Sequence, residues 1–312
     1  MSGEAFGLGG RTTSRGAAVE GIYGGGIGCG TSEDSKIWCN KKDIPGMTLA
    51  AISWCAMLYA EFVVLWVVFY TGVFHVMHAV LFTVVLSLAL ASHIKTMVTD
   101  PGAVPRNAQP IPRAGRGSVP ETVCGRCDAF KPPRAHHCRI CGRCIVRMDH
   151  HCPWMNNCVG AGNQKHFLLF LVYTLLACVY AIALVLYHFL DCFTGECPDT
   201  ATYDTASANM IRGLLLVSFA CMLFTFSMLM NQAHGVITGI GTVDRMQRRR
   251  KEGRIRGRPQ DHAPVLWEDV FGGGNRLLWL LPTDVVFTDS KRALGYHVEG
   301  GGRNPRDDYE EV

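Results

Sequence analysis

The sequence predicts an α-helical polytopic membrane protein with four transmembrane helices and a cysteine-rich domain between the second and the third. Two observations lead to this prediction. Four long apolar runs interrupt a chain of 312 residues that is 48% hydrophobic and only 18% charged, too apolar for an ordinary soluble enzyme. Between the second and third runs, residues 124–158 contain seven of the fourteen cysteines and four of the twelve histidines.

The first segment, residues 1–46, is expected to be a flexible cytosolic tail. Eleven glycines lie among its first thirty residues, and such a composition offers too little apolar surface to order a chain. No basic cluster precedes a short apolar core, so we expect no cleavable signal peptide. Cys29 and Cys39 lie in this segment and are expected to be free and inert, with acylation of either as the alternative.

Residues 47–98 predict transmembrane helices 1 and 2. The run 47–70 contains 24 residues with one charge, Glu61, and about 20 helical residues cross a bilayer core of about 30 Å. A very short turn connects it to the second run, 73–98, so the two helices form an antiparallel hairpin. Pro101 follows and stops the second helix.

Residues 166–230 predict transmembrane helices 3 and 4. The run 166–190 carries no charged residue, and the run 211–230 is similarly apolar. The connecting loop, 191–210, is acidic and has no lysine or arginine. Four spans place both ends of the chain on the same side of the membrane.

The distribution of basic residues predicts which side that is. Residues 99–165 contain ten lysines and arginines and residues 231–258 contain eight, whereas residues 191–210 contain none. Basic loops stay in the cytoplasm, so both termini and the domain 99–165 are expected there. The loop 191–210 is then luminal, and whether Cys192 and Cys197 pair in it stays open. We expect the protein in an endomembrane (Golgi or ER) or in the plasma membrane.

The last segment, residues 231–312, is expected to be a cytosolic tail. Its basic run, 245–258, either attracts anionic lipid or only stops transfer and aids solubility. The stretch 265–287 mixes Trp, Phe and Leu with Gly and Pro, and is expected to be a packed or interfacial piece. The final 25 residues are expected to be disordered.

The cysteine-rich stretch has the spacing of metal sites. Three cysteine pairs have a two-residue gap, and a closed zinc site takes four thiolate or imidazole ligands. Two sites use eight of the eleven candidates and leave three, whereas a single site would leave seven. Large apolar residues are few here, so metal binding should supply the folding energy. The eleven candidates are Cys124, Cys127, Cys138, Cys141, Cys144, Cys152, Cys158, His136, His137, His150 and His151.

Asp149, His150, His151 and Cys152 form one short run within this stretch. A cysteine with a histidine two residues earlier fits two metal ligands. It equally fits a nucleophile and its base, because an imidazole can take the thiol proton and a carboxylate can orient the imidazole. Composition and spacing leave both interpretations open.

The motifs of this region resemble those of the DHHC protein S-acyltransferases, the palmitoyltransferases. Residues 124–167 read C-x2-C-x9-HC-x2-C-x2-C-x4-DHHCPW-x2-NCVG-x2-N-x3-F. Residues 100–102 resemble the family's DPG motif, and the tail near residues 270–282 resembles its C-terminal segment more loosely. The family's TTxE motif is altered here to Gly-Thr-Val-Asp at Gly241 to Asp244, which puts contacts from those two positions in doubt.

The resemblance implies a partition of the ligands and a catalytic set. Both zinc ions are structural, since closed four-ligand sites offer no position to a reactant. The partition leaves Cys152, His150 and His136 without a metal. The resemblance implies that Cys152 is the nucleophile and His150 its base, with Asp149 holding the imidazole. The first zinc takes Cys124, Cys127, His137 and Cys144, and the second takes Cys138, Cys141, His151 and Cys158.

The same resemblance implies protein S-palmitoyl transfer. Cys152 would take a long-chain acyl group from acyl-CoA, the co-substrate, and pass it to cysteines of cytosolic or membrane-associated proteins. Lys131, Arg134 and His136 form a basic loop that we expect to contact the anionic CoA head, unless it is simply solvated. Ala177 on the third span, with Ala181, could leave room for the acyl chain.

The same residues are compatible with two other functions and argue against a third. A membrane-anchored zinc adaptor would need no nucleophile, and a cysteine hydrolase would use water in place of an acceptor thiol. A nucleic-acid-binding zinc finger does not fit, because the spacing lacks the 12-residue gap of C2H2 fingers and the net charge is only +4.

Overall fold

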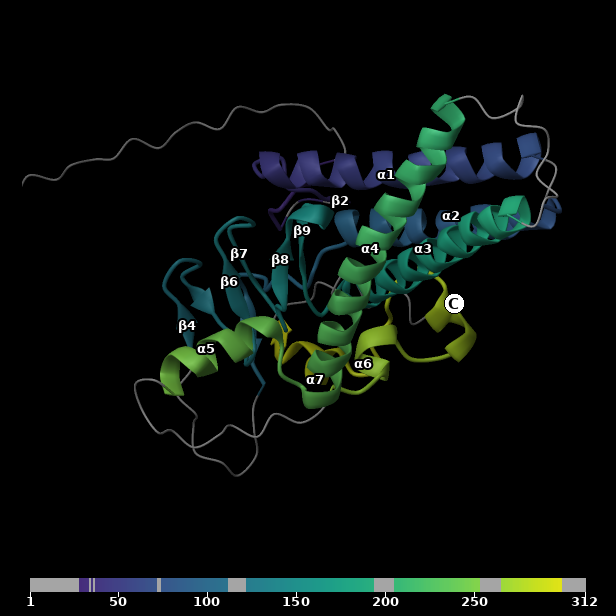
Figure 1. Cartoon of the computed structure of the whole chain (residues 1–312). Helices are drawn as coiled ribbons and strands as arrows, with labels where there is room; N and C mark the ends of the chain where they lie inside the picture. Colours follow the sequence, from purple (N-terminus) through teal and green to yellow (C-terminus); the bar gives the residue numbers. More distant parts are fainter. Residues whose placement is uncertain are drawn as a thin grey trace, which may run out of the picture.

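Four long helices form a bundle with a small β-rich domain at one end (Figure 1). The computed structural model describes residues 28–33, 35, 37–71, 74–111, 122–193, 205–252 and 265–298. The helices are α1 (Ile44–Thr71), α2 (Met77–Val98), α3 (Gln164–Phe193) and α4 (Thr205–Thr238). All four are long and apolar enough to cross a membrane, which confirms the predicted number of spans.

The predicted spans are shorter than the helices at several ends. α1 begins three residues before the expected Met47, and α4 runs from Thr205 to Thr238 instead of from 211 to 230. Helices continue past the apolar window because a helix does not need apolar residues to propagate, so hydropathy alone does not mark its ends. Most of the loop 191–210, including Cys197, lies outside the described residues, so the pairing of the two loop cysteines stays a prediction.

The bundle core is apolar and includes the end of the cysteine-rich domain. α3 packs between α2 and α4, and α4 crosses the others obliquely (Figure 1). Val63, Phe82, Leu171 and Leu214 are fully buried, one from each helix. Cys152 belongs to the same cluster. Many large apolar side chains on the outer faces of the helices are exposed, as lipid contact requires.

Three β-hairpins build the cysteine-rich domain. Their strands are short and antiparallel, and Figure 1 shows them gathered beyond the ends of the helices. The pairs are β4 (Val123–Cys124) with β5 (Ala129–Phe130), β6 (His136–Cys138) with β7 (Arg143–Ile145), and β8 (His150–Cys152) with β9 (Asn157–Val159). The domain follows α2 and precedes α3, as predicted.

The last hairpin is fixed to the end of α2 by two asparagines. The Nδ2 amide of Asn157 donates to the carbonyls of Thr96, Met97 and Thr99 at 2.9 to 3.2 Å. Asn163 adds a bond to the Thr96 carbonyl at 3.2 Å. The last carbonyls of a helix have no partner within the helix, so these amides satisfy them and lock the hairpin to the bundle.

The segment before α1 is folded, which corrects the expectation of a flexible tail through residue 46. Residues 28–43, here called the N-terminal strap, lie against the cysteine-rich domain, and the described part contains β1 (Cys29–Gly30) and β2 (Ile37–Trp38) in parallel. Trp38 is buried beside Cys138 and Cys141. The glycine-rich composition of this segment gave no indication that the large side chain of Trp38 anchors it to the domain. The first 27 residues of the predicted tail lie outside the described residues.

Cys29 and Cys39 are joined by a disulfide within the strap. The expectation that both are free and inert is therefore wrong for this structure. Cys39 directly follows β2, and its backbone N–H donates to the Gly30 carbonyl at 3.0 Å. The parallel pairing of β1 and β2 therefore brings Cys39 close to Cys29, with 5.6 Å between their Cα atoms, which the sequence spacing did not indicate.

The chain after α4 returns to the cysteine-rich domain. α5 (Thr242–Glu252), α6 (Glu268–Phe271), the 3-10 turn η3 (Arg276–Leu280) and α7 (Ser290–Leu294) follow one another. The last strand, β10 (Tyr296–Val298), pairs antiparallel with β3 (Ala108–Pro110). Residues 290–298 are thus ordered, which corrects the prediction of disorder over the last 25 residues.

The stretch 265–287 has one buried face and one exposed face. Val270 is fully buried against Leu168 and Val236, whereas Leu277 is 73% exposed. Arg147 of the cysteine-rich domain donates to the Asp269 carbonyl at 3.2 Å. The Arg147 guanidinium and the buried Val270 attach this stretch to the rest of the protein, as expected of a packed piece.

Candidate functional site

The alternation of side chains along short strands explains the arrangement of the cysteines and histidines. Successive residues of a strand point to opposite faces, so neighbours in sequence separate in space. In β6, His137 faces away from Cys138, and in β8, His151 faces away from His150 and Cys152. The β6–β7 hairpin therefore supplies candidate ligands to two different clusters, and the β8–β9 hairpin separates His151 from His150 and Cys152.

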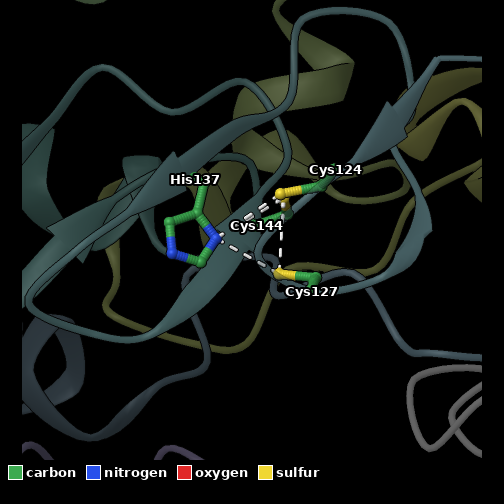
Figure 2. Close-up of side chains that lie close together, drawn as sticks. All are labelled: Cys124, Cys127, His137 and Cys144. Atoms are coloured by element: carbon green, nitrogen blue, oxygen red, sulfur yellow. Dashed lines mark hydrogen bonds between the residues drawn. The ribbon is translucent and has the colours of Figure 1, made fainter.

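The first cluster joins a cysteine knuckle to a cross-strand pair. Cys124 and Cys127 lie in the β4–β5 turn, and His137 pairs with Cys144 across β6 and β7. Figure 2 shows these four side chains converging, with the imidazole nitrogen directed at the sulfurs. His137 Nδ1 lies 3.7, 3.2 and 4.0 Å from the sulfurs of Cys124, Cys127 and Cys144.

The second cluster repeats this design. Cys138 and Cys141 lie in the β6–β7 turn, and His151 pairs with Cys158 across β8 and β9. His151 Nδ1 lies 3.7, 3.5 and 3.6 Å from the three sulfurs, in chain order. The Sγ atoms of Cys141 and Cys158 lie 3.5 Å apart.

These distances fit a tetrahedral metal ion. In each cluster all four ligand atoms lie within 4.8 Å of one another. Zinc–sulfur bonds of about 2.3 Å and zinc–nitrogen bonds of about 2.0 Å at tetrahedral angles require about 3.8 Å between sulfurs and about 3.5 Å between nitrogen and sulfur. Both clusters come close to these values. Three thiolates and one imidazole could thus hold a metal ion in each, and the two ligand sets are those expected from the resemblance.

Asp149, His150 and Cys152 lie together where the hairpin meets the bundle core. His150 Nδ1 donates to Asp149 Oδ2 at 2.7 Å. His150 and Cys152 share one face of β8, and Cys152 is 4% exposed. Because Nδ1 is bonded to Asp149, Nε2 is the ring nitrogen left to exchange a proton with a thiol.

The electrostatics of the site favour the charged forms of Asp149 and His150. Burial lowers the pKa of His150, but hydrogen bonds and negative charge from Asp149 and Cys152 outweigh it and raise this pKa to about 9. Burial also opposes ionisation of Asp149, yet the hydrogen bonds it accepts lower its pKa to about 2. An imidazolium at His150 stabilises a neighbouring thiolate, which is the nucleophilic form of cysteine.

The segment after α4 holds Asp149 in place. The Thr242 backbone N–H donates to Asp149 Oδ1 at 2.6 Å, and Gln232 Nε2 donates to Asp149 Oδ2 at 2.7 Å. Both contacts were missed from the sequence. Gln232 falls two residues beyond the predicted fourth span. The only feature of the sequence that could have pointed to it is that a polar amide directly follows an apolar run.

The altered motif at residues 241–244 still contacts the site. A Cβ at Gly241 would lie 3.3 Å from Asp149 Oδ1, so glycine lets the Thr242 backbone approach the carboxylate. His136 Nε2 lies 2.7 Å from Asp244 Oδ1. Asp244 thus makes a contact even though it replaces the glutamate of the family motif. Gly241 offers no side chain, and the backbone N–H of the next residue, Thr242, supports Asp149 instead.

Two residues of the basic loop contact the chain that follows α4: Arg134 bonds to the connection between α4 and α5, and His136 bonds to α5 itself. Arg134 donates to the Gly239 carbonyl at 2.7 Å. His136, besides its pair with Asp244, accepts from Gln247 Nε2 at 3.2 Å. Burial lowers the pKa of Arg134 despite the nearby Asp244. Lys131 lies in the same loop, where its backbone N–H pairs with the Thr122 carbonyl.

The small residues of the third span lie in the core beneath Cys152. Ala177 is 4% exposed and Ala181 is fully buried, and both belong to the apolar cluster that contains Cys152. Their bearing on the acyl chain stays a prediction.

Comparisons with known proteins agree with this geometry. Residues 118–249 match the family DHHC palmitoyltransferase. The chain is 36% identical to palmitoyltransferase ZDHHC3-A of Danio rerio over 80% of this chain and 78% of that protein. It is 39% identical to human palmitoyltransferase ZDHHC3 over 67% and 73%, and 36% identical to mouse palmitoyltransferase ZDHHC7 over 81% and 82%. The chain belongs to the DHHC palmitoyltransferase family.

Proposed function

We propose that this protein is a protein S-palmitoyltransferase, which transfers a long-chain acyl group from acyl-CoA to cysteines of proteins at the cytosolic face of a membrane. One observation supports this most directly. Cys152 lies beside the Asp149–His150 pair and at the same time belongs to the apolar core of the helix bundle. A nucleophile placed between a polar base and an apolar interior suits a substrate with a polar thioester and an alkyl chain.

The first step forms an acyl-enzyme. The Cys152 thiolate attacks the thioester carbonyl, a new carbon–sulfur bond forms, and the bond to the CoA sulfur breaks. The leaving CoA thiolate takes the proton held at His150 Nε2. Asp149 keeps the imidazole oriented through Nδ1.

The second step passes the acyl group on. His150, now neutral, accepts the proton of an acceptor cysteine thiol at Nε2, and that sulfur attacks the acyl carbonyl on Cys152. The Cys152 thiolate leaves and pairs again with the imidazolium. One thioester replaces another in each step, so neither needs an oxidant or an energy source.

We assign structural zinc to both clusters. The Cys3His donor sets are closed, and metal binding would contribute to folding a domain that has little core of its own. His151 of the second cluster directly precedes Cys152, so this cluster would orient the strand that carries the nucleophile.

The bilayer would surround the four apolar helices. The basic residues of 99–165 and 231–258 support placing the cysteine-rich domain and both termini in the cytosol. The acyl chain would extend from Cys152 into the bundle, where each buried CH₂ is worth about 0.8 kcal/mol. Residues Ala177 and Ala181 would then face the chain.

The CoA head remains near the basic loop in this proposal. Arg134 and His136 lie close to the α4–α5 segment that supports Asp149, which supports a route for the anionic head past this side of the site. Lys131 lies in the same loop. His136 would have to share its contact with Asp244 to bind a phosphate.

Transfer to an acceptor thiol tests the proposed reaction. Purified protein is incubated with labelled palmitoyl-CoA and a membrane-tethered peptide that contains one cysteine. We expect hydroxylamine-sensitive label on this peptide, and none on the same peptide with serine. A hydrolase would release free palmitate at the same rate with either peptide, and an adaptor would consume no palmitoyl-CoA.

A further inference from the structure

The N-terminal strap makes three separate contacts with the second cluster. Trp38 is buried in one apolar cluster with Cys138, Cys141 and Cys158. Asn40 Nδ2 lies 3.9 Å from the Cys141 sulfur, within hydrogen-bonding range for sulfur. Asp43 Oδ2 lies 2.9 Å from His151 Nε2. These residues lie about 100 positions before the cluster in the sequence, so the contacts arise from the fold.

Asp43 and His151 have the geometry of a carboxylate that supports a metal-bound histidine. His151 turns Nδ1 toward the three sulfurs, which leaves Nε2 to donate a hydrogen bond to Asp43. Both side chains are 8% exposed, so water does not compete effectively for this bond. A carboxylate on the second ring nitrogen fixes the tautomer and ring orientation and makes the metal-binding nitrogen more basic.

The same carboxylate begins the first transmembrane helix. Asp43 Oδ1 accepts from the Gly46 N–H at 3.1 Å, as an N-cap residue does. Gly46 has no side chain to obstruct this, and a Cβ there would lie 2.2 Å from Asp43 Oδ2. The two oxygens of one side chain thus connect the start of α1 to the second cluster.

We propose that Asp43, with Asn40, forms the outer ligand shell of the second metal site, so that the segment before the first span is a component of that site. Asp43 is a positioning residue that acts through His151. The proposal depends on a metal ion in the second cluster and not on acyl transfer. In contrast, no carboxylate among the described residues pairs with His137, so the first cluster provides an internal reference.

Zinc release from purified full-length protein tests this proposal. A chromogenic chelator is added, and the release of the two ions is followed by absorbance, with the initial zinc content measured by mass spectrometry. Asp43→Ser keeps a side-chain oxygen for the helix cap but is too short to reach His151. Gly46→Ala leaves Asp43 in place but adds a Cβ where Oδ2 lies. Lys42→Gln, an exposed neighbour, is the control.

We expect one of the two ions to leave roughly 10- to 100-fold faster in Asp43→Ser and in Gly46→Ala. The other ion should leave at the wild-type rate, and Lys42→Gln should match wild type for both. The result should be the same in a Cys152→Ala background, where no acyl transfer is possible. Wild-type release of both ions in Asp43→Ser and Gly46→Ala would overturn the proposal, as would equal acceleration of both ions, which indicates general loosening.

Discussion

Gln232 on α4 donates a hydrogen bond to Asp149 Oδ2, the same oxygen that accepts from His150. Gln232 is 2% exposed and Asp149 is 6% exposed. The Gln232 amide on α4 therefore holds one oxygen of the carboxylate, while the Thr242 N–H holds the other. The orientation of His150, the proposed base, therefore depends on a residue more than 80 positions away in the chain.

Replacing Gln232 by Leu should slow acylation of the enzyme. A buried hydrogen bond to a charged group contributes about 1.5–3 kcal/mol, so we expect the first-order acylation rate at saturating palmitoyl-CoA to fall on the order of tenfold or more. The KM for palmitoyl-CoA should change little, because Gln232 touches no substrate in the proposed mechanism. Met230→Leu, on an exposed face of the same helix, is the matched control. An unchanged rate in Gln232→Leu would show that Asp149 needs no support from α4.

Replacing Gly241 by threonine, the residue of the family motif, should not increase the acylation rate. A Cβ at Gly241 would lie 3.3 Å from Asp149 Oδ1, and the oxygen already accepts from the Thr242 N–H. We expect Gly241→Thr to lower the acylation rate by a few fold, since the added side chain crowds this contact. Gly235→Thr, where a Cβ would meet only the Ile240 carbonyl at 3.7 Å, controls for the loss of a glycine in this region. A faster Gly241→Thr enzyme would contradict the account.

Asp149→Asn should change how acylation depends on pH. The pKa of His150 is raised to about 9, so its protonated form, which the proposed first step requires, persists from about pH 6 to about pH 8. Removing the Asp149 charge lets this pKa fall toward the ordinary value of about 6.5. Since imidazolium is then lost as pH rises, the ratio of the rate at about pH 8 to that at about pH 6 should be smaller than in wild type. An identical ratio would remove Asp149 from the control of His150.

Removal of metal should inactivate the protein without unfolding its helices. Cys141→Ser removes one ligand of the second cluster, so we expect about one zinc per chain in place of two. Acyl-enzyme formation should be lost, because the hairpin that carries Cys152 also carries two of the ligands. The helical circular dichroism should remain near wild type, since the four long helices hold no ligand. Two retained zinc ions with full activity would contradict the assignment of the cluster.

Local sequence patterns predicted most residues of this site, but they did not predict contacts between residues that lie far apart in the chain. Apolar length marks a span wherever it occurs, and the two-residue gaps mark the knuckles at Cys124 and Cys138. Strand alternation could also have separated His137 from Cys138 without any family resemblance. No local signal links Gln232 to Asp149, because the contact depends on how α4 packs against the hairpin.

The N-terminal strap shows why composition misled the prediction. Glycine content averaged over 46 residues suggested a flexible tail, although three side chains near its end are buried. Trp38, Asn40 and Asp43 gain order from the domain on which they lie and not from each other. The ordered C-terminal strand β10 was missed for the same reason, since its partner β3 lies near residue 109.

Acylation of Cys152 is the central claim, and intact-protein mass spectrometry with peptide mapping tests it most directly. Purified protein is mixed with palmitoyl-CoA, quenched in acid within one turnover, and digested. We predict one palmitoyl group per chain, located on Cys152, removed by neutral hydroxylamine and absent from Cys152→Ala. A palmitoyl group on any other cysteine with wild-type kinetics in Cys152→Ala would contradict the account.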